Sequence, residues 1–257
     1  MITANEALKR LQDGNARFAS GVRSIDTLVK QIHRTELVAR QEPFARILGC
    51  SDSRVPAELV FDQGLGDLFV IRVAGNVVAP SQIGSVEFAA QRFGTPLVVV
   101  LGHSMCGTVA ATIDDLTTPS ESHTSSILSI INRIRPTVEP LFHTELRNDP
   151  ERLLDAAIRA NILAATNQRR HGSGLIEQSV QDGTLTTVGA EYSVENGRVE
   201  LSTDFSQTGL WGRGSCSSEG AVALSDPGTG ADPFVAPNQC AVTWRIQDSD
   251  PTNRRIS

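Results

Sequence analysis

The strongest constraint on this sequence is the run Leu97–Leu101 (LVVVL), an unbroken series of apolar and mostly β-branched residues. Because no polar residue alternates with them, the run predicts a strand that is covered on both faces, as in parallel sheets. Two shorter apolar runs precede it, Phe44–Cys50 and Leu68–Val73. Helices are expected between the three strands, a short one with Pro56 in its first turn and a longer one that Ser81 can cap. Strands that alternate with helices predict a parallel sheet.

The second half of the sequence changes character after the third strand. A helix is expected from about Cys106, and residues 123–182 are predicted to be mostly helical. Breaks are expected at Pro136, Pro140, Pro150 and the His171–Gly174 stretch. Thr184–Ser193 and Arg198–Thr203 then follow as two strands joined across Asn196-Gly197, a strong hairpin signal. The predicted fold class is α/β, with a mainly parallel central β-sheet, an antiparallel edge strand and flanking helices.

Both ends of the chain differ from this central pattern. Residues 1–40 predict a helical arm, with a capping box at Thr3 and Glu6 and a second helix from about Thr27 to Arg40. The apolar stripes of the arm fit packing either on their own core or on a partner subunit. After about residue 205, Ser, Gly and Pro rise to roughly a third of the residues and apolar periodicity ends. We therefore expect one domain over 1–205 and an atypical, disordered tail over 206–257. A sequence that has drifted out of its ancestral frame is the alternative for this segment.

Composition narrows the classes of function. The formal net charge is −6, which disfavours a nucleic-acid partner because such proteins present a basic face. No apolar run approaches the roughly 18–20 residues that span a bilayer, so no membrane association is expected. The first residues show neither the basic nor the apolar region of a secretory leader, which favours a cytoplasmic location. In that reducing compartment, cysteines serve metal or redox chemistry more often than disulfides.

Two polar motifs follow the first and third predicted strands. Cys50-Ser51-Asp52-Ser53-Arg54 stands where the first strand ends, and Gly102-His103-Ser104-Met105-Cys106-Gly107 stands at the end of the third and opens a helix. Because the carboxyl ends of parallel strands meet at one edge of a sheet, Cys50, His103 and Cys106 can come together there. Two thiolates and an imidazole suit zinc. A cysteine that ends a buried strand is usually just a small buried hydrophobic residue, so the metal interpretation depends on the two motifs occurring together.

Three ligands favour a catalytic over a structural zinc site, because structural zinc is usually closed by four protein ligands. The fourth position would be open to water or to the carboxylate of Asp52. Arg54 lies two residues on and can pair with that carboxylate, which would draw it off the metal. The alternative is that Asp52 and Arg54 form an exposed turn pair of little energetic value.

The runs CSDSRVP, RVAGN and GHSMCG, together with VGAEYSVENGRVEL, resemble a β-class carbonic anhydrase over roughly residues 1–205. The resemblance implies zinc-dependent reversible hydration of carbon dioxide to bicarbonate and a proton. It places the zinc ligands on Cys50, His103 and Cys106, and the family's aspartate–arginine dyad on Asp52 and Arg54. Gln41 resembles the residue that positions the substrate, and Asp52 would bind zinc only in a closed, inactive state. These positions are the candidate metal and catalytic residues.

The resemblance also implies a homodimer or a higher even oligomer. Arg72 and Asn76 match polar positions of the family's second strand and the loop after it. Ile47 stands where members with a regulatory bicarbonate site tend to carry tryptophan, and RVAGN stands where many relatives have RNVAN. Two other functions remain open, a non-catalytic zinc-bearing binding module and hydrolysis of carbon disulfide or carbonyl sulfide. Arg54 and Gln41 favour an enzyme, because a structural site needs neither.

Overall fold

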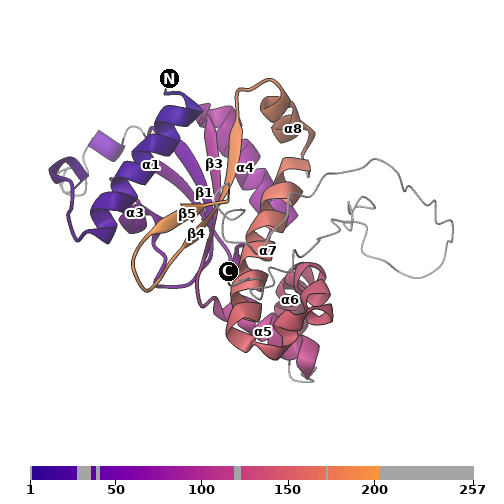
Figure 1. Cartoon of the computed structure of the whole chain (residues 1–257). Helices are drawn as coiled ribbons and strands as arrows, with labels where there is room; N and C mark the ends of the chain where they lie inside the picture. Colours follow the sequence, from indigo (N-terminus) through magenta and orange to yellow (C-terminus); the bar gives the residue numbers. More distant parts are fainter. Residues whose placement is uncertain (1, 28–35, 39–40, 119–122, 172, 203–257) are drawn as a thin grey trace, which may run out of the picture. The chain divides into compact units, whose positions relative to one another are not determined.

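A five-stranded sheet forms the centre of the protein (Figure 1). The computed structural model describes residues 2–27, 36–38, 41–118, 123–171 and 173–202. In spatial order the strands are β2 (Leu68–Arg72), β1 (Ala45–Gly49), β3 (Leu97–His103), β4 (Thr186–Tyr192) and β5 (Val199–Leu201). The first four are parallel to their neighbours, and β5 is antiparallel to β4. The predicted fold class is confirmed.

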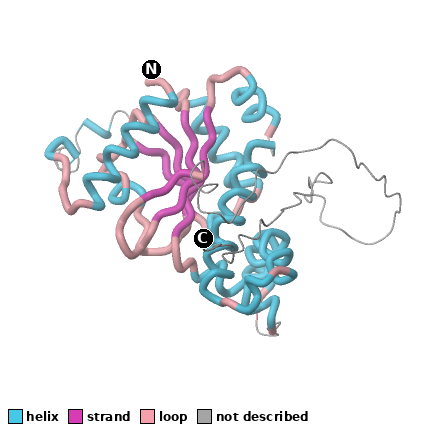
Figure 2. Tube along the Cα trace, viewed as in Figure 1, coloured by secondary structure: helices cyan, strands magenta, loops and turns pink. Residues whose placement is uncertain are grey.

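Helices cover both faces of the sheet (Figures 1 and 2). One face packs on α1 (Ala4–Ala19) and α3 (Ala57–Val60). The other face packs on α4 (Pro80–Phe93), α7 (Pro150–His171) and α8 (Gly174–Gln181). Two further helices follow the carboxyl end of β3 and pack on each other and on α7, namely α5 (Gly107–Thr117) and α6 (Ser125–Val138). Short 3-10 turns are η1 (Glu36–Val38), η2 (Ala74–Asn76), η3 (Glu139–His143) and η4 (Glu145–Asn148).

The core explains why β3 is apolar without interruption. Leu97, Val99 and Leu101 point to the face that α1 covers, whereas Val98 and Val100 point to the face that α4 and α8 cover. All five are at most 1% exposed. Successive side chains of a strand point to opposite faces, so a strand between two helical layers needs apolar residues at every position.

The N-terminal helix is built as predicted. The Thr3 hydroxyl accepts a hydrogen bond from the Glu6 amide, and the Glu6 carboxylate accepts one from the Thr3 amide. Leu11 is buried in the core of its own chain, and Leu8 packs against the same cluster. Most of the predicted second helix, and the predicted tail of residues 206–257, lie outside the described residues.

Two local predictions are wrong. Ser81 does not cap α4, which begins at Pro80 with Ala79 as its N-cap and no capping side chain. Proline suits this position because the first helical N–H has no intrahelical acceptor. Pro136 does not break the chain but lies inside α6, three residues before the capping residue Glu139. A proline this close to the end removes one hydrogen bond and leaves the preceding turns intact. Pro150 begins α7, in agreement with the expected break.

The otherwise apolar strand β1 contains one charged residue, and that residue is buried. Arg46 is 1% exposed, and its guanidinium donates to the carbonyl oxygens of Val86 and Thr95. Burial lowers the pKa of Arg46 to about 10. The two carbonyls belong to α4 and to the segment after it, so the buried guanidinium ties that helix to the middle of the sheet.

Candidate metal site

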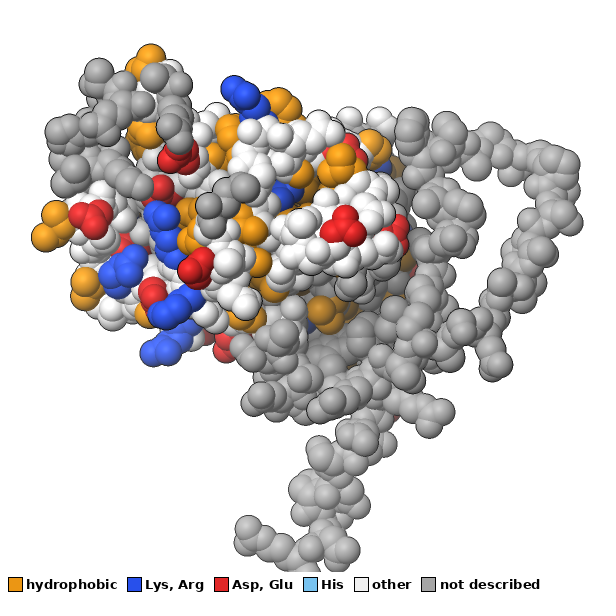
Figure 3. All heavy atoms as spheres, turned by 90° about the horizontal axis from the view of Figure 1, so that it is seen from above, with side chains coloured by type: hydrophobic (Ala, Val, Ile, Leu, Met, Phe, Trp, Pro, Cys, Tyr) orange, Lys and Arg blue, Asp and Glu red, His pale blue; other side chains and the backbone are white. Residues whose placement is uncertain are grey.

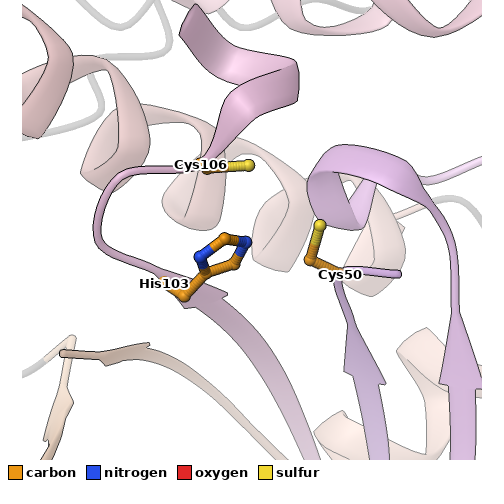
Figure 4. A group of neighbouring side chains, drawn as sticks. All are labelled: Cys50, His103 and Cys106. Carbon is orange, nitrogen blue, oxygen red and sulfur yellow. The ribbon is translucent and has the colours of Figure 1, made fainter. Parts of the chain in front are cut away.

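Three side chains converge at the carboxyl edge of the sheet (Figure 4). Cys50 follows β1 directly, His103 is the last residue of β3, and Cys106 is the N-cap of α5. The strands β1 and β3 are parallel neighbours with Gly49 opposite Leu101, which brings their ends to one level. One ligand atom from each of the three residues lies within 4.8 Å of the others, and all three residues are buried. The predicted juxtaposition is therefore present.

The imidazole of His103 is prepared to donate a lone pair to a metal. Its Nδ1 lies 3.0 Å from the carbonyl oxygen of Ser104, which can only accept, so the proton belongs on Nδ1. Its Nε2 is then an acceptor, and it is buried without a hydrogen-bond partner. A backbone acceptor that fixes the tautomer is the usual outer contact of a metal-ligating histidine. This orphaned nitrogen and the two adjacent thiols fit a zinc ion.

The two thiols are electrostatically linked. A hydrogen bond from Cys106 lowers the pKa of Cys50 well below its usual range, against the burial that would raise it. The same contact with Cys50, together with burial, raises the pKa of Cys106. A cation bound between the two sulfur atoms would favour the thiolate form of both.

Asp52 and Arg54 stand beside this cluster as a bidentate pair. Arg54 Nε lies 2.9 Å from Asp52 Oδ1, and Arg54 Nη2 lies 2.7 Å from Asp52 Oδ2. Arg54 is the main reason that the pKa of Asp52 is held well below its usual range. Oδ2 of Asp52 is also 3.9 Å from Nε2 of His103. Arg54 donates in addition to the carbonyl oxygen of Met105 at 3.2 Å, so it links the two loops that carry the cluster. A simple surface turn pair would not make that second contact.

Arg72, at the end of β2, holds the first of these loops. Its Nε donates to the carbonyl oxygen of Cys50 at 3.0 Å, and its Nη2 donates to that of Asp52 at 2.5 Å. Asn76 is buried behind the cluster with a positive φ of 45°. Both positions had been matched to polar residues of the family by sequence. Sequence reasoning missed Asn161 of α7, which donates to the carbonyl oxygen of Gly75. No sequence pattern identifies a helical asparagine whose partner is a backbone carbonyl.

Gln41 is not part of the cluster within one chain. The residue is exposed and lies beside Gly66, whose added Cβ would be 3.9 Å from the Gln41 Cα. Among the described residues, no hydrogen bond or ion pair joins Gln41 to Cys50, His103 or Cys106. Its predicted role therefore stays a prediction.

Surface features are consistent with the composition. On the face shown in Figure 3, basic and acidic side chains are interspersed. Among the helices of the described residues, none is both long enough and apolar enough to cross a membrane.

Known proteins that are similar to this chain over most of its length are carbonic anhydrases. A family model described as "Carbonic anhydrase" matches residues 45–199. A carbonic anhydrase of Mycolicibacterium smegmatis is 38% identical over 203 residues, which cover 79% of this chain and 95% of that protein. Carbonic anhydrase 2 of Mycobacterium tuberculosis is 36% identical and covers 76% of this chain and 91% of the relative.

Solved structures with the same fold are β-carbonic anhydrases. The enzyme CcaA superposes with a TM-score of 0.59 at 24% identity, covering 76% of this chain and 86% of that one. A structure described among two tetrameric β-carbonic anhydrases of Sordaria macrospora gives 0.58 at 23% identity, covering 77% and 96%.

Proposed function

Since this chain belongs to the β-carbonic anhydrase family, we propose that it hydrates carbon dioxide reversibly with a zinc ion held by Cys50, His103 and Cys106. Hydration of carbon dioxide is the reaction of the family. The observation that carries the proposal is the convergence of the two thiols on the buried, unpartnered Nε2 of His103. That donor set fits zinc.

A zinc ion at this position would act as a Lewis acid and supply hydroxide near neutral pH. The residues of the chain would direct that nucleophile. The carboxylate of Asp52 is ionised throughout the neutral range, since the ordinary pKa of an aspartate is about 4 and Arg54 lowers it further. It can therefore accept a hydrogen bond from the attacking hydroxide and aim its lone pair at the substrate. Arg54 fixes the carboxylate through both oxygens.

Asp52 has a second possible partner. Its Oδ2 lies 3.9 Å from Nε2 of His103, so a modest rotation away from Arg54 would bring the carboxylate to the metal position. In that arrangement the site would be closed and inactive, and Arg54 would be the competitor that keeps it open. Arg54 thus supports activity by retaining Asp52.

We also propose a homodimer, or a higher even oligomer, in which Gln41 reaches the site of the neighbouring subunit as a donor to carbon dioxide. Exposed apolar side chains support this assembly, with Ile25 76% and Val38 88% exposed. Light scattering that finds a fully active monomer would refute the assembly.

We propose a cytoplasmic location as well. The free thiols Cys50 and Cys106 support it, because the redox environment of the cytoplasm keeps thiols reduced.

The test is stopped-flow hydration of carbon dioxide by wild-type protein, with zinc measured on the same sample. We expect one zinc per chain and a hydration rate far above that of buffer. Protein that holds one zinc per chain but does not accelerate hydration would refute the enzyme and favour a non-catalytic zinc module. The same preparation assayed with carbon disulfide and carbonyl sulfide would reveal a different substrate within the same site.

A further inference from the structure

The turn η2 places a backbone donor on one of the proposed metal ligands. The amide nitrogen of Gly75 lies 3.3 Å from Sγ of Cys50. Gly75 has φ 66° and Asn76 has φ 45°, so two consecutive residues adopt the left-handed conformation. Glycine and asparagine are the residues that adopt it at least cost. The sequence at this turn therefore fits the conformation that directs an N–H group at the sulfur.

The same turn is held from behind by α7. Asn161 is 4% exposed, and its Nδ2 donates to the carbonyl oxygen of Gly75 at 2.8 Å. The carbonyl that Asn161 holds and the N–H that reaches Cys50 belong to the two peptide units on either side of the Gly75 Cα. Fixing the first limits rotation of the second. The contacts run from α7 through Gly75 to the sulfur of Cys50.

We propose that Asn161 is a positioning residue for the metal site, which acts by keeping the Gly75 amide hydrogen-bonded to the Cys50 sulfur. The inference rests on the proposed function, because it assigns Cys50 as a zinc ligand. A hydrogen bond to a thiolate withdraws electron density from the sulfur, so the sulfur donates less charge to the metal. Outer contacts of this kind typically change metal affinity by 10–100-fold. A merely structural asparagine would satisfy the Gly75 carbonyl and leave the properties of the sulfur unchanged.

The chain offers a matched control in Asn15 of α1. It is 6% exposed, and its Nδ2 donates to the carbonyl oxygen of Gly197 at 2.8 Å. Gly197 also has a positive φ, of 76°. Asn15 thus makes the same kind of contact with the same kind of residue, but its further partners are Val60 and Val199 and include no proposed ligand.

The first experiment uses wild-type protein, so it does not depend on whether a variant folds. Zinc is replaced by ¹¹³Cd in protein labelled with ¹⁵N-glycine, and the glycine amide protons are examined for coupling to the metal across N–H···S. We expect one coupled glycine, which sequential assignment through Ala74 and Asn76 in uniformly labelled wild-type protein identifies as Gly75. Absence of any coupled glycine in cadmium-loaded protein would overturn the inference.

The second experiment compares Asn161→Ala and the isosteric Asn161→Asp with Asn15→Ala. Zinc affinity is measured by competition with a chelator, and the sulfur is probed through the charge-transfer band of the cobalt-substituted protein. We expect about a 10-fold or larger loss of zinc affinity in both Asn161 variants. We also expect a shift of the cobalt band to longer wavelength, because a sulfur without its donor releases charge more easily. Asn15→Ala should change neither property.

The outcomes separate this inference from the proposed function. Wild-type protein that binds no zinc would refute the metal site itself. Wild-type protein with one zinc, and folded Asn161 variants with unchanged affinity and an unchanged cobalt band, would overturn only the role of Asn161. Equal shifts in Asn15→Ala would likewise overturn it, since they would indicate a general loss of stability. If both Asn161 variants fail to fold, the smaller change Asn161→Ser takes their place in the same two measurements, and the coupling in wild-type protein tests the Gly75 contact itself.

Discussion

Two buried asparagines, in two regions of this protein, each donate a hydrogen bond to the carbonyl oxygen of a left-handed glycine. Only one of the two regions contains a proposed metal ligand. Asn15 joins α1 to α3 and the β4–β5 hairpin, donating to Val60 and Gly197 and accepting from the Val199 amide. Every partner of Asn15 is a backbone group, and none of these groups belongs to a proposed metal ligand. Asn161 holds a similar left-handed glycine, but the amide of that glycine is directed at Cys50. The regions differ in where a backbone donor points, rather than in the side chains used.

The regions also differ in the space around their glycines. A Cβ on Gly75 would lie 2.7 Å from Cδ1 of Ile134, whereas a Cβ on Gly197 would lie 3.3 Å from Cε1 of Phe18. A cavity of about 450 Å³ lies beside the hairpin, and residues of α1, β4 and β5 are among those that line it. None of Cys50, His103 or Cys106 lines that cavity. Gly75 is therefore more closely surrounded than Gly197.

The largest difference should appear on removal of a ligand. Cys106→Ala leaves two of three protein donors, so we expect near-complete loss of zinc by metal analysis. Asn15→Ala, in the hairpin region, should retain one zinc per chain. Full zinc retained in both Cys50→Ala and Cys106→Ala would contradict the ligand assignment.

The next largest effect should follow Arg54→Ala, with a loss of about 100-fold in hydration rate and no loss of zinc. Removing Arg54 raises the pKa of Asp52 toward the ordinary value of about 4. Asp52 then remains ionised between pH 6.5 and 9, so the loss must come from its position and not from protonation. Asp52→Ala should also keep zinc and lose activity.

Stopped-flow assays of zinc-loaded protein across pH 6.5–9 test this effect. Wild-type activity should be low in mild acid and climb on the alkaline side, because hydroxide then competes better with the Asp52 carboxylate. The matched control is Arg17→Ala, since Arg17 Nε makes a comparable 2.6 Å pair with Asp62 beside α1. Wild-type rates in Arg54→Ala at every pH would remove both residues from the mechanism.

A smaller contrast is expected between Gly75→Ala and Gly197→Ala. Both impose a side chain on a positive φ, at a cost of about 1–2 kcal/mol. Gly75→Ala must also displace Ile134, so its total loss in free energy of unfolding should reach about 3 kcal/mol. Urea unfolding of the two variants measures the difference. Equal losses would show that the turn near the cluster is no more constrained than the hairpin.

The smallest effect should come from the tail. Truncation after Phe205 is expected to leave hydration activity intact and to change the free energy of unfolding by less than about 0.5 kcal/mol, because the removed residues lack the apolar pattern that offsets ordering entropy. Activity and denaturation measurements on the truncated chain test this. Loss of folding would place residues 206–257 within the domain.

Sequence alone predicted the sheet and the juxtaposition of Cys50, His103 and Cys106 for one physical reason. An apolar run such as Leu97–Leu101 requires two covering layers, and strands in such a sheet end at a common edge. The two motifs at the ends of β1 and β3 could therefore be predicted to lie side by side before any side-chain contact was known. The antiparallel pairing of β4 with β5 was predicted separately, from the hairpin signal of Asn196-Gly197.

What the sequence did not predict depends on partners distant in the chain. Arg46 reads as an interruption of an apolar strand until the carbonyls of Val86 and Thr95 are seen around it. Asn161 reads as an ordinary helical residue until its contact with Gly75 is known. In both cases the acceptor is a backbone carbonyl, which every residue carries, so no residue type marks the partner.

The register of β3 has a consequence for biosynthesis. Leu97 pairs with Ala45 on one side but with Thr186 on the other, so roughly 90 residues must be synthesised before that second edge is covered. At about 5–20 residues per second the delay is roughly 5–20 seconds. During that time an apolar strand edge of the nascent chain stays open to other chains. We expect the newly made protein to depend on chaperones at the ribosome. That dependence should end once β4 has been synthesised and has paired with β3.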